Sequence, residues 1–143
     1  MLRLMQEEPG TGLPDLAAAL GLTPGRVARR QDRLREAGIL QGVGAVIDLR
    51  ALGFAVHVSL RITLDKTAPR AFDDFIAAAR EVPEVIEIQT FLGRVDVRLS
   101  VVARNLPAYQ TLYRNRLLAL PHIADIESLM TVAVVKSDES LPL

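Results

Sequence analysis

The side chains best placed to do chemistry are four arginines within residues 23–38. They recur at the spacing of an α-helix, and at about 100° per residue they project within an arc of roughly 100°. A guanidinium remains charged at physiological pH and offers paired N–H donors that fit a phosphate or the edge of a guanine. Four of them on one face predict contact with a polyanion. They are Arg26, Arg29, Arg30 and Arg33.

A single helix with clear start and stop signals is predicted to carry these arginines. Thr23 can cap the first free N–H groups, and Pro24 suits the first helical position because its missing N–H is not needed there. Gly38 can adopt the left-handed conformation that ends a helix. Val27 and Leu34 point to a neighbouring face and can anchor it. Positive charge is thus concentrated on a helix anchored on one side and bare on the other.

Two shorter helices are predicted before it, over residues 1–8 and 12–20. Pro9-Gly10 ends the first, and Gly21 closes the second. A helix, a glycine-containing turn and a capped basic helix form the helix-turn-helix pattern, in which the second helix enters the major groove of DNA. The alternative is a pair of packed helices with a solvated arginine face. We expect DNA contacts from Thr23, Gly25, Arg26, Arg29, Arg30 and Arg33, mostly to phosphates.

Composition excludes several other kinds of protein. The chain has 143 residues, half of them hydrophobic, and a formal net charge of zero, which argues against indiscriminate binding of polyanions. It has no cysteine and two histidines far apart, so we expect no disulfide, no metal site and no cofactor. An acidic pair interrupts the apolar start of the chain, so a signal peptide is not expected and the protein is predicted to be cytoplasmic.

The pattern of apolar residues changes after Gly53. Residues 54–64 alternate between apolar and polar with a period of two, as in a long β-strand. Further strands and helices are predicted in an order that gives β-α-β-β-α-β, a ferredoxin-like arrangement. The protein is therefore predicted to be α+β, with a winged-helix-like N-terminal module. The remaining elements are a helix over 69–80, strands over 85–92 and 96–103, a helix over 105–120 and a strand within 123–135.

These elements predict four parts of the chain. Residues 1–40 form the helix-turn-helix domain, 41–53 a hinge strand and linker, 54–136 the βαββαβ domain, and 137–143 a polar tail. Two helices can cover only one face of the four-stranded sheet. If the other face exposed alternating Val, Ile and Leu it would be costly, at about 25 cal/mol per Å² of apolar surface. We therefore expect a homodimer built through the sheet, which would read two DNA half-sites about 34 Å apart.

Five short runs, each weak alone, form a pattern along nearly the whole chain. Residues 16–23 read LAAALGLT, and residues 30–42 read RQDRLREAGILQG. Residues 93–96 read GRVD, residues 107–109 read PAY, and residues 120–123 read LPHI. Together they resemble the helix-turn-helix, the strand-connecting loop and the later segments of the Lrp/AsnC transcription regulators of bacteria and archaea.

The resemblance implies a regulator whose C-terminal domain senses ligands and whose dimers assemble into tetramers or octamers. It also implies a small effector, often an amino acid, bound between dimers near Gly93, Arg94 and Asp96. Arg94 stands where the family commonly has an acid, and its charge would repel an ammonium group and favour a carboxylate. A hairpin salt link is the alternative role for Arg94 and Asp96.

Two other functions remain open at this point. One is a ligand-sensing oligomer that does not bind DNA. The other is an enzyme, because siroheme decarboxylases share this layout; they would be expected to carry His and Tyr near the loop, and residues 90–96 contain neither. No nucleophile–base pair or carboxylate dyad is visible elsewhere, so the prediction is a regulator and not an enzyme.

Overall fold

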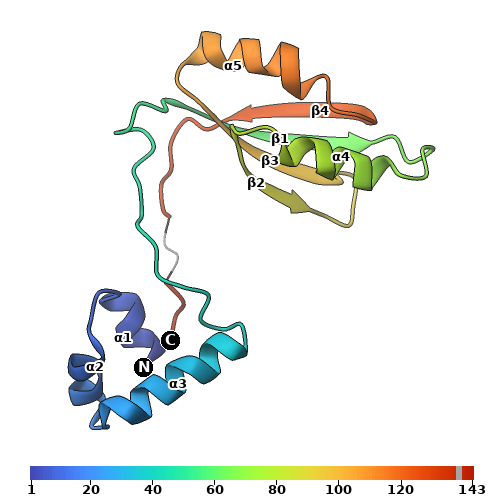
Figure 1. Cartoon of the computed structure of the whole chain (residues 1–143). Coiled ribbons are helices and arrows are strands. Elements are labelled where there is room, and N and C mark those ends of the chain that lie inside the picture. The colour runs from blue at the N-terminus through green and yellow to red at the C-terminus, as the bar shows by residue number, and fades with distance from the viewer. Residues whose placement is uncertain (138–139) are drawn as a thin grey trace. The chain divides into compact units, whose positions relative to one another are not determined.

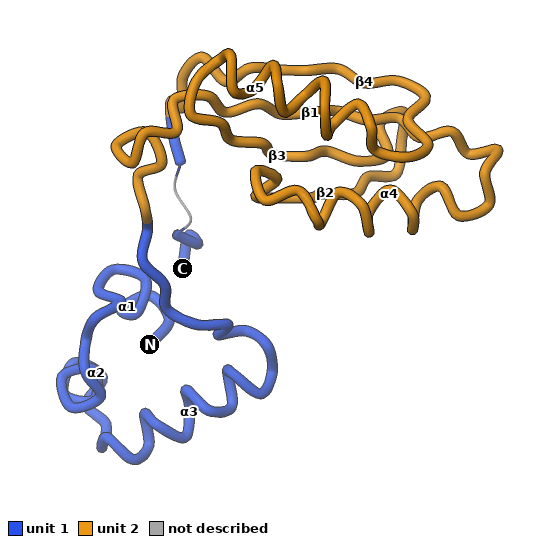
Figure 2. The backbone as a smooth tube through the Cα atoms, turned by 45° about the horizontal axis from the view of Figure 1, so that its top comes forward, with its two compact units in different colours: residues 1–46, 136–143 blue, residues 47–135 orange. Residues whose placement is uncertain are grey.

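A computed structural model describes residues 1–137 and 140–143 of the chain. Residues 138 and 139, which belong to the predicted tail, lie outside the described residues. The chain forms two compact units (Figure 2). Unit 1 consists of residues 1–46 and 136–143, and unit 2 consists of residues 47–135.

Unit 1 is a three-helix assembly with a small core. Its helices are α1 (Leu2–Glu7), α2 (Leu13–Leu20) and α3 (Pro24–Glu36), shown in Figure 1. Leu16 and Ala17 from α2 and Val27 from α3 are buried together. Gly38 has a φ of 70°, so the left-handed turn predicted after the third helix is present. Gly21, predicted to close the second helix, is also left-handed, with a φ of 64°.

The hinge strand predicted within residues 41–53 is absent. Residues 40–48 adopt no regular secondary structure, although their Val and Ile content favours a strand. A strand is held by hydrogen bonds to a neighbouring strand, and no described segment of the chain pairs with this one. The prediction was wrong because β-propensity alone supplies no pairing partner.

Unit 2 has the predicted βαββαβ order. Its strands pair antiparallel throughout, in the spatial order β2-β3-β1-β4. The second helix, α5, continues directly into a π-helical turn, η1. The elements are β1 (Val56–Leu64), α4 (Ala71–Arg80), β2 (Val85–Thr90), β3 (Val97–Ala103), α5 (Leu106–Leu112), η1 (Tyr113–Leu117) and β4 (Ile123–Met130).

Both helices of unit 2 pack on the same face of the sheet. Leu60 and Leu99, from the two central strands, are fully buried in one cluster with Phe75 of α4 and Leu117 of η1. Because strand side chains alternate between faces, the apolar residues of β1 all point to this cluster. The alternation in residues 54–64 therefore describes the covered face of the sheet.

The opposite face of the sheet is mostly polar, with Val102 beside His57 and Leu129 beside Ser59, so it exposes fewer apolar side chains than the alternation led us to expect. Arg61 lies beside Arg98 of β3 on one side and Glu127 of β4 on the other. Arg98 pairs with Glu87 of β2 at 3.3 Å, and His57 makes a hydrogen bond with Ser100. In β1 a period of two sends every apolar side chain to one face, and the helices cover that face. A dimer built through this face stays a prediction, and its apolar contribution would come from side chains such as Leu129, which is 37% exposed.

Candidate nucleic-acid interface

Helix α3 is fixed to unit 1 by one side. Val27 is completely buried against α2, and Leu22, just before the helix, packs on the same cluster. Pro24 occupies the start of the helix and Ala37 caps its end. This anchoring leaves the remaining circumference of the helix facing solvent, so side chains on it are held at fixed positions by the buried side.

The four predicted arginines are all exposed and lie together. They line one surface hollow of about 360 Å³, to which no other described residue contributes. Arg29 Nε donates to the carbonyl oxygen of Gly25 at 3.3 Å, which holds one guanidinium against the first turn of the helix. The sequence prediction that these side chains share a face agrees with their placement around the hollow. They are Arg26, Arg29, Arg30 and Arg33.

The positive charge of this surface is not neutralised by any described residue of the chain. Among the described residues, no carboxylate lies within 4.0 Å of any of the four guanidinium groups. On the same helix, Arg35 is paired with Asp32 at 3.2 Å. Four unpaired guanidinium groups around one hollow attract a polyanion, because each can make charge-assisted hydrogen bonds to phosphate oxygens.

Thr23 and Gly25 differ in what they can contribute. Thr23 precedes the helix with extended backbone angles, but its hydroxyl makes no capping hydrogen bond, so the predicted side-chain cap is wrong. Its carbonyl oxygen instead accepts from the N–H groups of Arg26 and Val27. Gly25 has open space where a Cβ would lie, so another molecule's backbone can approach it closely. The free hydroxyl of Thr23 is likewise available to a ligand.

The second predicted site, around Gly93, Arg94 and Asp96, is not brought together in one cavity. Asp96 lines a hollow of about 240 Å³ with Lys66, to which neither Gly93 nor Arg94 contributes. Arg94 is exposed, and its carbonyl oxygen accepts from the hydroxyl of Thr63 at 2.9 Å. Of the three, only Arg94 presents a charged group to solvent.

Asp96 is a buried link between β1 and the loop before β3. Its Oδ2 accepts from the N–H of Leu64 at 2.8 Å, and its Oδ1 pairs with Lys66 Nζ at 3.1 Å. The hydrogen bond from Leu64, and then Lys66, hold the pKa of Asp96 below its ordinary value of 3.8 against the opposing effect of burial. Both carboxylate oxygens are thus occupied inside the chain, although the partner in the salt link is Lys66 and not Arg94.

Other kinds of site are not apparent in the described parts of the chain. No three His, Asp or Glu side chains among these residues gather as metal ligands would. None of the described helices is long and apolar enough to span a membrane.

Sequence reasoning missed one contact in unit 1. The segment predicted as a polar tail ends in Leu141-Pro142-Leu143, and these residues contact α1 through Arg3 and Gln6. The sequence offered one signal, which is that this otherwise polar segment ends in two leucines around a proline. Without the structure, nothing indicated that residues so distant in sequence would meet.

Comparison with known families identifies both units. Residues 1–41 match a winged helix-turn-helix DNA-binding family, and residues 57–141 match the Lrp/AsnC ligand-binding domain. The second match alone spans more than half of the chain. The chain belongs to the Lrp/AsnC family. It is a transcriptional regulator of the Lrp/AsnC type, with a helix-turn-helix DNA-binding domain.

Named relatives are similar over most of their length. The proline dehydrogenase transcriptional activator of Rhodobacter capsulatus is 32% identical over 88% of this chain and 82% of its own. The leucine-responsive regulatory protein of Escherichia coli is 28% identical over 99% of this chain and 86% of its own. A Neisseria meningitidis transcriptional regulator solved with L-methionine has a TM-score of 0.88 at 26% identity, covering 99% of this chain and 91% of that one.

Proposed function

We propose that this Lrp/AsnC regulator binds duplex DNA through the exposed face of α3. The observation that carries the proposal is the cluster of four unpaired arginines around one hollow on an anchored helix. Most of these side chains bind phosphates, and one or two read guanine, because base contacts are a minority at such interfaces. A regulator acting on DNA works in the cytoplasm and needs no catalytic group.

Self-association extends the proposal, through the open sheet face and through a second apolar surface in unit 1. Unit 1 exposes apolar side chains along the segment after α3, with Ile39, Val43 and Val46 exposed by 60%, 67% and 97%. Exposed apolar groups this close in sequence favour burial against a second copy. A two-fold dimer would present two α3 helices to half-sites about 34 Å apart, and further dimers would give a tetramer or octamer.

A small effector is proposed for unit 2. The Neisseria meningitidis regulator and a Mycobacterium tuberculosis feast or famine regulatory protein, 26% identical to this chain, were each solved with L-methionine. In this chain, Arg94 is exposed and offers its charge to the carboxylate of an amino acid or a 2-oxo acid. Asp96 is already engaged by Leu64 and Lys66, so we assign it a supporting role.

The DNA proposal is tested by a gel mobility shift with the DNA upstream of this protein's own coding region, at two salt concentrations. We expect a laddered shift that weakens steeply with salt, because phosphate contacts release counterions. A folded oligomer that gives no shift at low salt would overturn DNA binding and favour a ligand sensor.

The effector proposal has a separate test. Thermal unfolding is followed with L-methionine, other amino acids and 2-oxo acids, since a ligand that binds the folded state raises the melting temperature. Arg94→Ala is the matched variant, and it should lose the shift. If no compound in either class raises the melting temperature of the wild-type protein, the effector proposal fails and the DNA proposal stands.

A further inference from the structure

The last residues of the chain lie against its first helix. Gln6 holds the backbone of Leu141 from both sides, because its Oε1 accepts from the Leu141 N–H at 2.8 Å and its Nε2 donates to the Leu141 carbonyl at 3.3 Å. Three residues earlier on α1, Arg3 Nε donates to the carbonyl oxygen of Leu143 at 2.7 Å. Residues three apart lie on one face of a helix, so Arg3 and Gln6 form a single docking surface.

The docked segment has a conformation suited to this surface. The N–H of Leu143 donates to the carbonyl of Leu141 at 2.8 Å, which folds the chain tightly around Pro142. Proline also restricts the free chain, so less conformational entropy is lost when the segment docks. Both leucines keep contact with unit 1, although Leu141 is 62% exposed and Leu143 is 47% exposed. Hydrogen bonds to the backbone therefore hold the segment more than apolar burial does.

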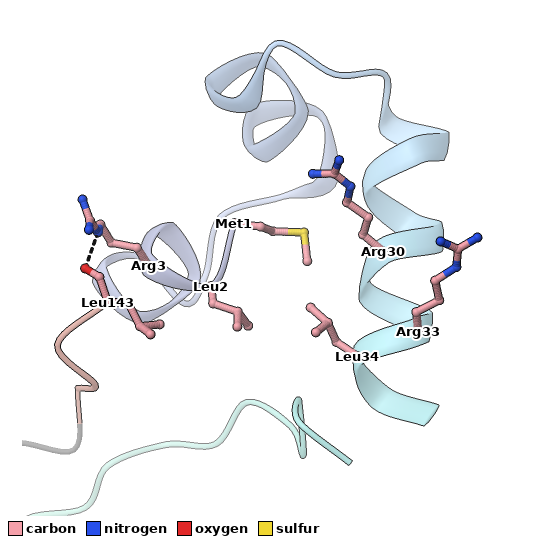
Figure 3. Close-up of a pocket in the computed structure, with 7 residues that line it drawn as sticks. All are labelled: Met1, Leu2, Arg3, Arg30, Arg33, Leu34 and Leu143. Atoms are coloured by element: carbon pink, nitrogen blue, oxygen red, sulfur yellow. Dashed lines mark hydrogen bonds between the residues drawn. The ribbon is translucent and has the colours of Figure 1, made fainter. Parts of the chain in front are cut away.

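Two hollows in unit 1 have residues of this segment in their walls. One, of about 530 Å³, is lined mainly by apolar atoms and has Leu143 in its wall. Figure 3 shows Met1, Leu2 and Leu34 pointing toward one another in it, with Arg3 reaching Leu143. The other, of about 400 Å³, lies along the segment after α3 and is walled by Leu141 and Leu143. The tail thus adds apolar surface to a unit with few buried residues.

We propose that residues 140–143 are a working part of the DNA-binding unit, docked in cis on the Arg3–Gln6 surface of α1. The chain leaves unit 1 at Val46 and returns to it at Lys136. When the tail is docked, unit 2 is therefore connected to unit 1 at both of its ends. A segment tied to its own protein is present at a high effective concentration, which favours docking within one chain over docking on a second copy.

Cross-linking tests where the tail docks. The chain has no cysteine, so Leu2→Cys with Leu141→Cys gives the only two thiols, and both positions line the same hollow. This variant keeps the side chains of Arg3 and Gln6 and is treated with a short bifunctional thiol reagent. We expect a link within one chain. The control pairs Leu141→Cys with Asp15→Cys on α2, an exposed position outside the docking surface, and should react poorly. Equal yields from both pairs, or a link found only between two chains, would overturn docking in cis.

Hydrogen exchange tests what docking does. Deletion of residues 140–143, or Gln6→Ala, should raise exchange of the α1 amides about tenfold, the equilibrium change that one net hydrogen bond produces. Glu7→Ala is the matched control, since Glu7 is exposed on the same helix and lines neither of the two hollows that Leu143 borders. Unchanged α1 exchange in both altered proteins, or equal changes in the control, would show that the tail does not support unit 1.

Discussion

The two units of this regulator differ in how their residues are divided between core and surface. Among the described residues, the buried core of unit 1 consists of Leu16, Ala17 and Val27, whereas that of unit 2 has 16 members. Unit 1 exposes four unpaired arginines on one helix, and the open sheet face of unit 2 pairs Arg98 with Glu87. Unit 1 therefore gathers unpaired charge on one helix face, whereas the open sheet face of unit 2 pairs part of its charge within the fold.

A small core also makes unit 1 the part of the molecule that is easier to unfold. Hydrophobic burial is the main favourable term in folding, and small units bury a smaller fraction of their surface. Contacts from the C-terminal segment and from DNA would each add stability to such a unit.

Leu16→Ala should unfold unit 1 and leave unit 2 intact. Leu16 is buried to 99% in a three-residue core, and its truncation costs about 2–5 kcal/mol, which is large for so small a unit. Leu99→Ala in β3 is the matched control with a similar cost in a larger core. Amide exchange measured separately for each unit distinguishes them. If both variants loosen both units together, the units are not independent.

Asp96→Ala should destabilise unit 2 by about 1–3 kcal/mol at neutral pH, because the buried N–H of Leu64 loses its acceptor. Asp96→Asn keeps an acceptor and should lose less. The charged form of Asp96 is favoured in the folded state, so its contribution is present above pH 3.8 and lost as pH falls through the lower folded pKa. Denaturant titrations of both variants against pH measure this, and identical acid sensitivity of Asp96→Ala and wild type would contradict it.

Arg30→Ala and Arg33→Ala should each weaken DNA binding about tenfold, the value of one charge-assisted hydrogen bond. Each should also reduce the dependence of log affinity on log salt by about one unit, since one phosphate contact is lost. Arg114→Ala, an exposed arginine of unit 2, is the charge-matched control. Affinity is measured by fluorescence anisotropy at several salt concentrations. An unchanged salt slope in both α3 variants would count against this face of the helix.

The smallest expected effect is a difference in stability between variants of the two residues that precede α5 and α3. Asn105 Oδ1 accepts from the N–H of Ala108 at 2.8 Å, so Asn105→Ala should cost about 1 kcal/mol. Thr23 makes no such bond, so Thr23→Ala should cost less than about 0.5 kcal/mol of stability. Thermal unfolding measures both. A larger loss for Thr23→Ala than for Asn105→Ala would show that the Thr23 hydroxyl caps α3 in solution.

Local sequence signals predicted most of the fold. Helix α3 was predictable because Pro24 signals its start, Gly38 signals its end and Val27 marks its buried side. Strand β1 was predictable from its strict alternation of apolar and polar residues. These features depend on residues near one another in the chain. Features that need a distant partner were not predictable in the same way. Residues 40–48 have the composition of a strand but no described strand to pair with. The tail contacts α1 although the two segments lie at opposite ends of the sequence.

The two candidate sites also differ in whether local sequence or a distant contact determines them. The shared face of the arginines follows from helical geometry alone, and the structure places all four around one hollow. The group around Gly93, Arg94 and Asp96 depended on tertiary placement. Asp96 is drawn to the N–H of Leu64, 32 positions earlier in the chain, while Arg94 stays in solvent. Spacing in the sequence could not distinguish an inward from an outward side chain in a loop.

The central claim is that the exposed face of α3 meets DNA, and one measurement tests it directly. Because the chain has no cysteine, Arg29→Cys and Arg114→Cys each supply one thiol for a photoactivatable cross-linker. After illumination with duplex DNA at low salt, we predict a covalent DNA adduct from position 29 in α3 and none from position 114 in unit 2. Equal adducts from both positions, or an adduct from position 114 alone, would contradict the claim.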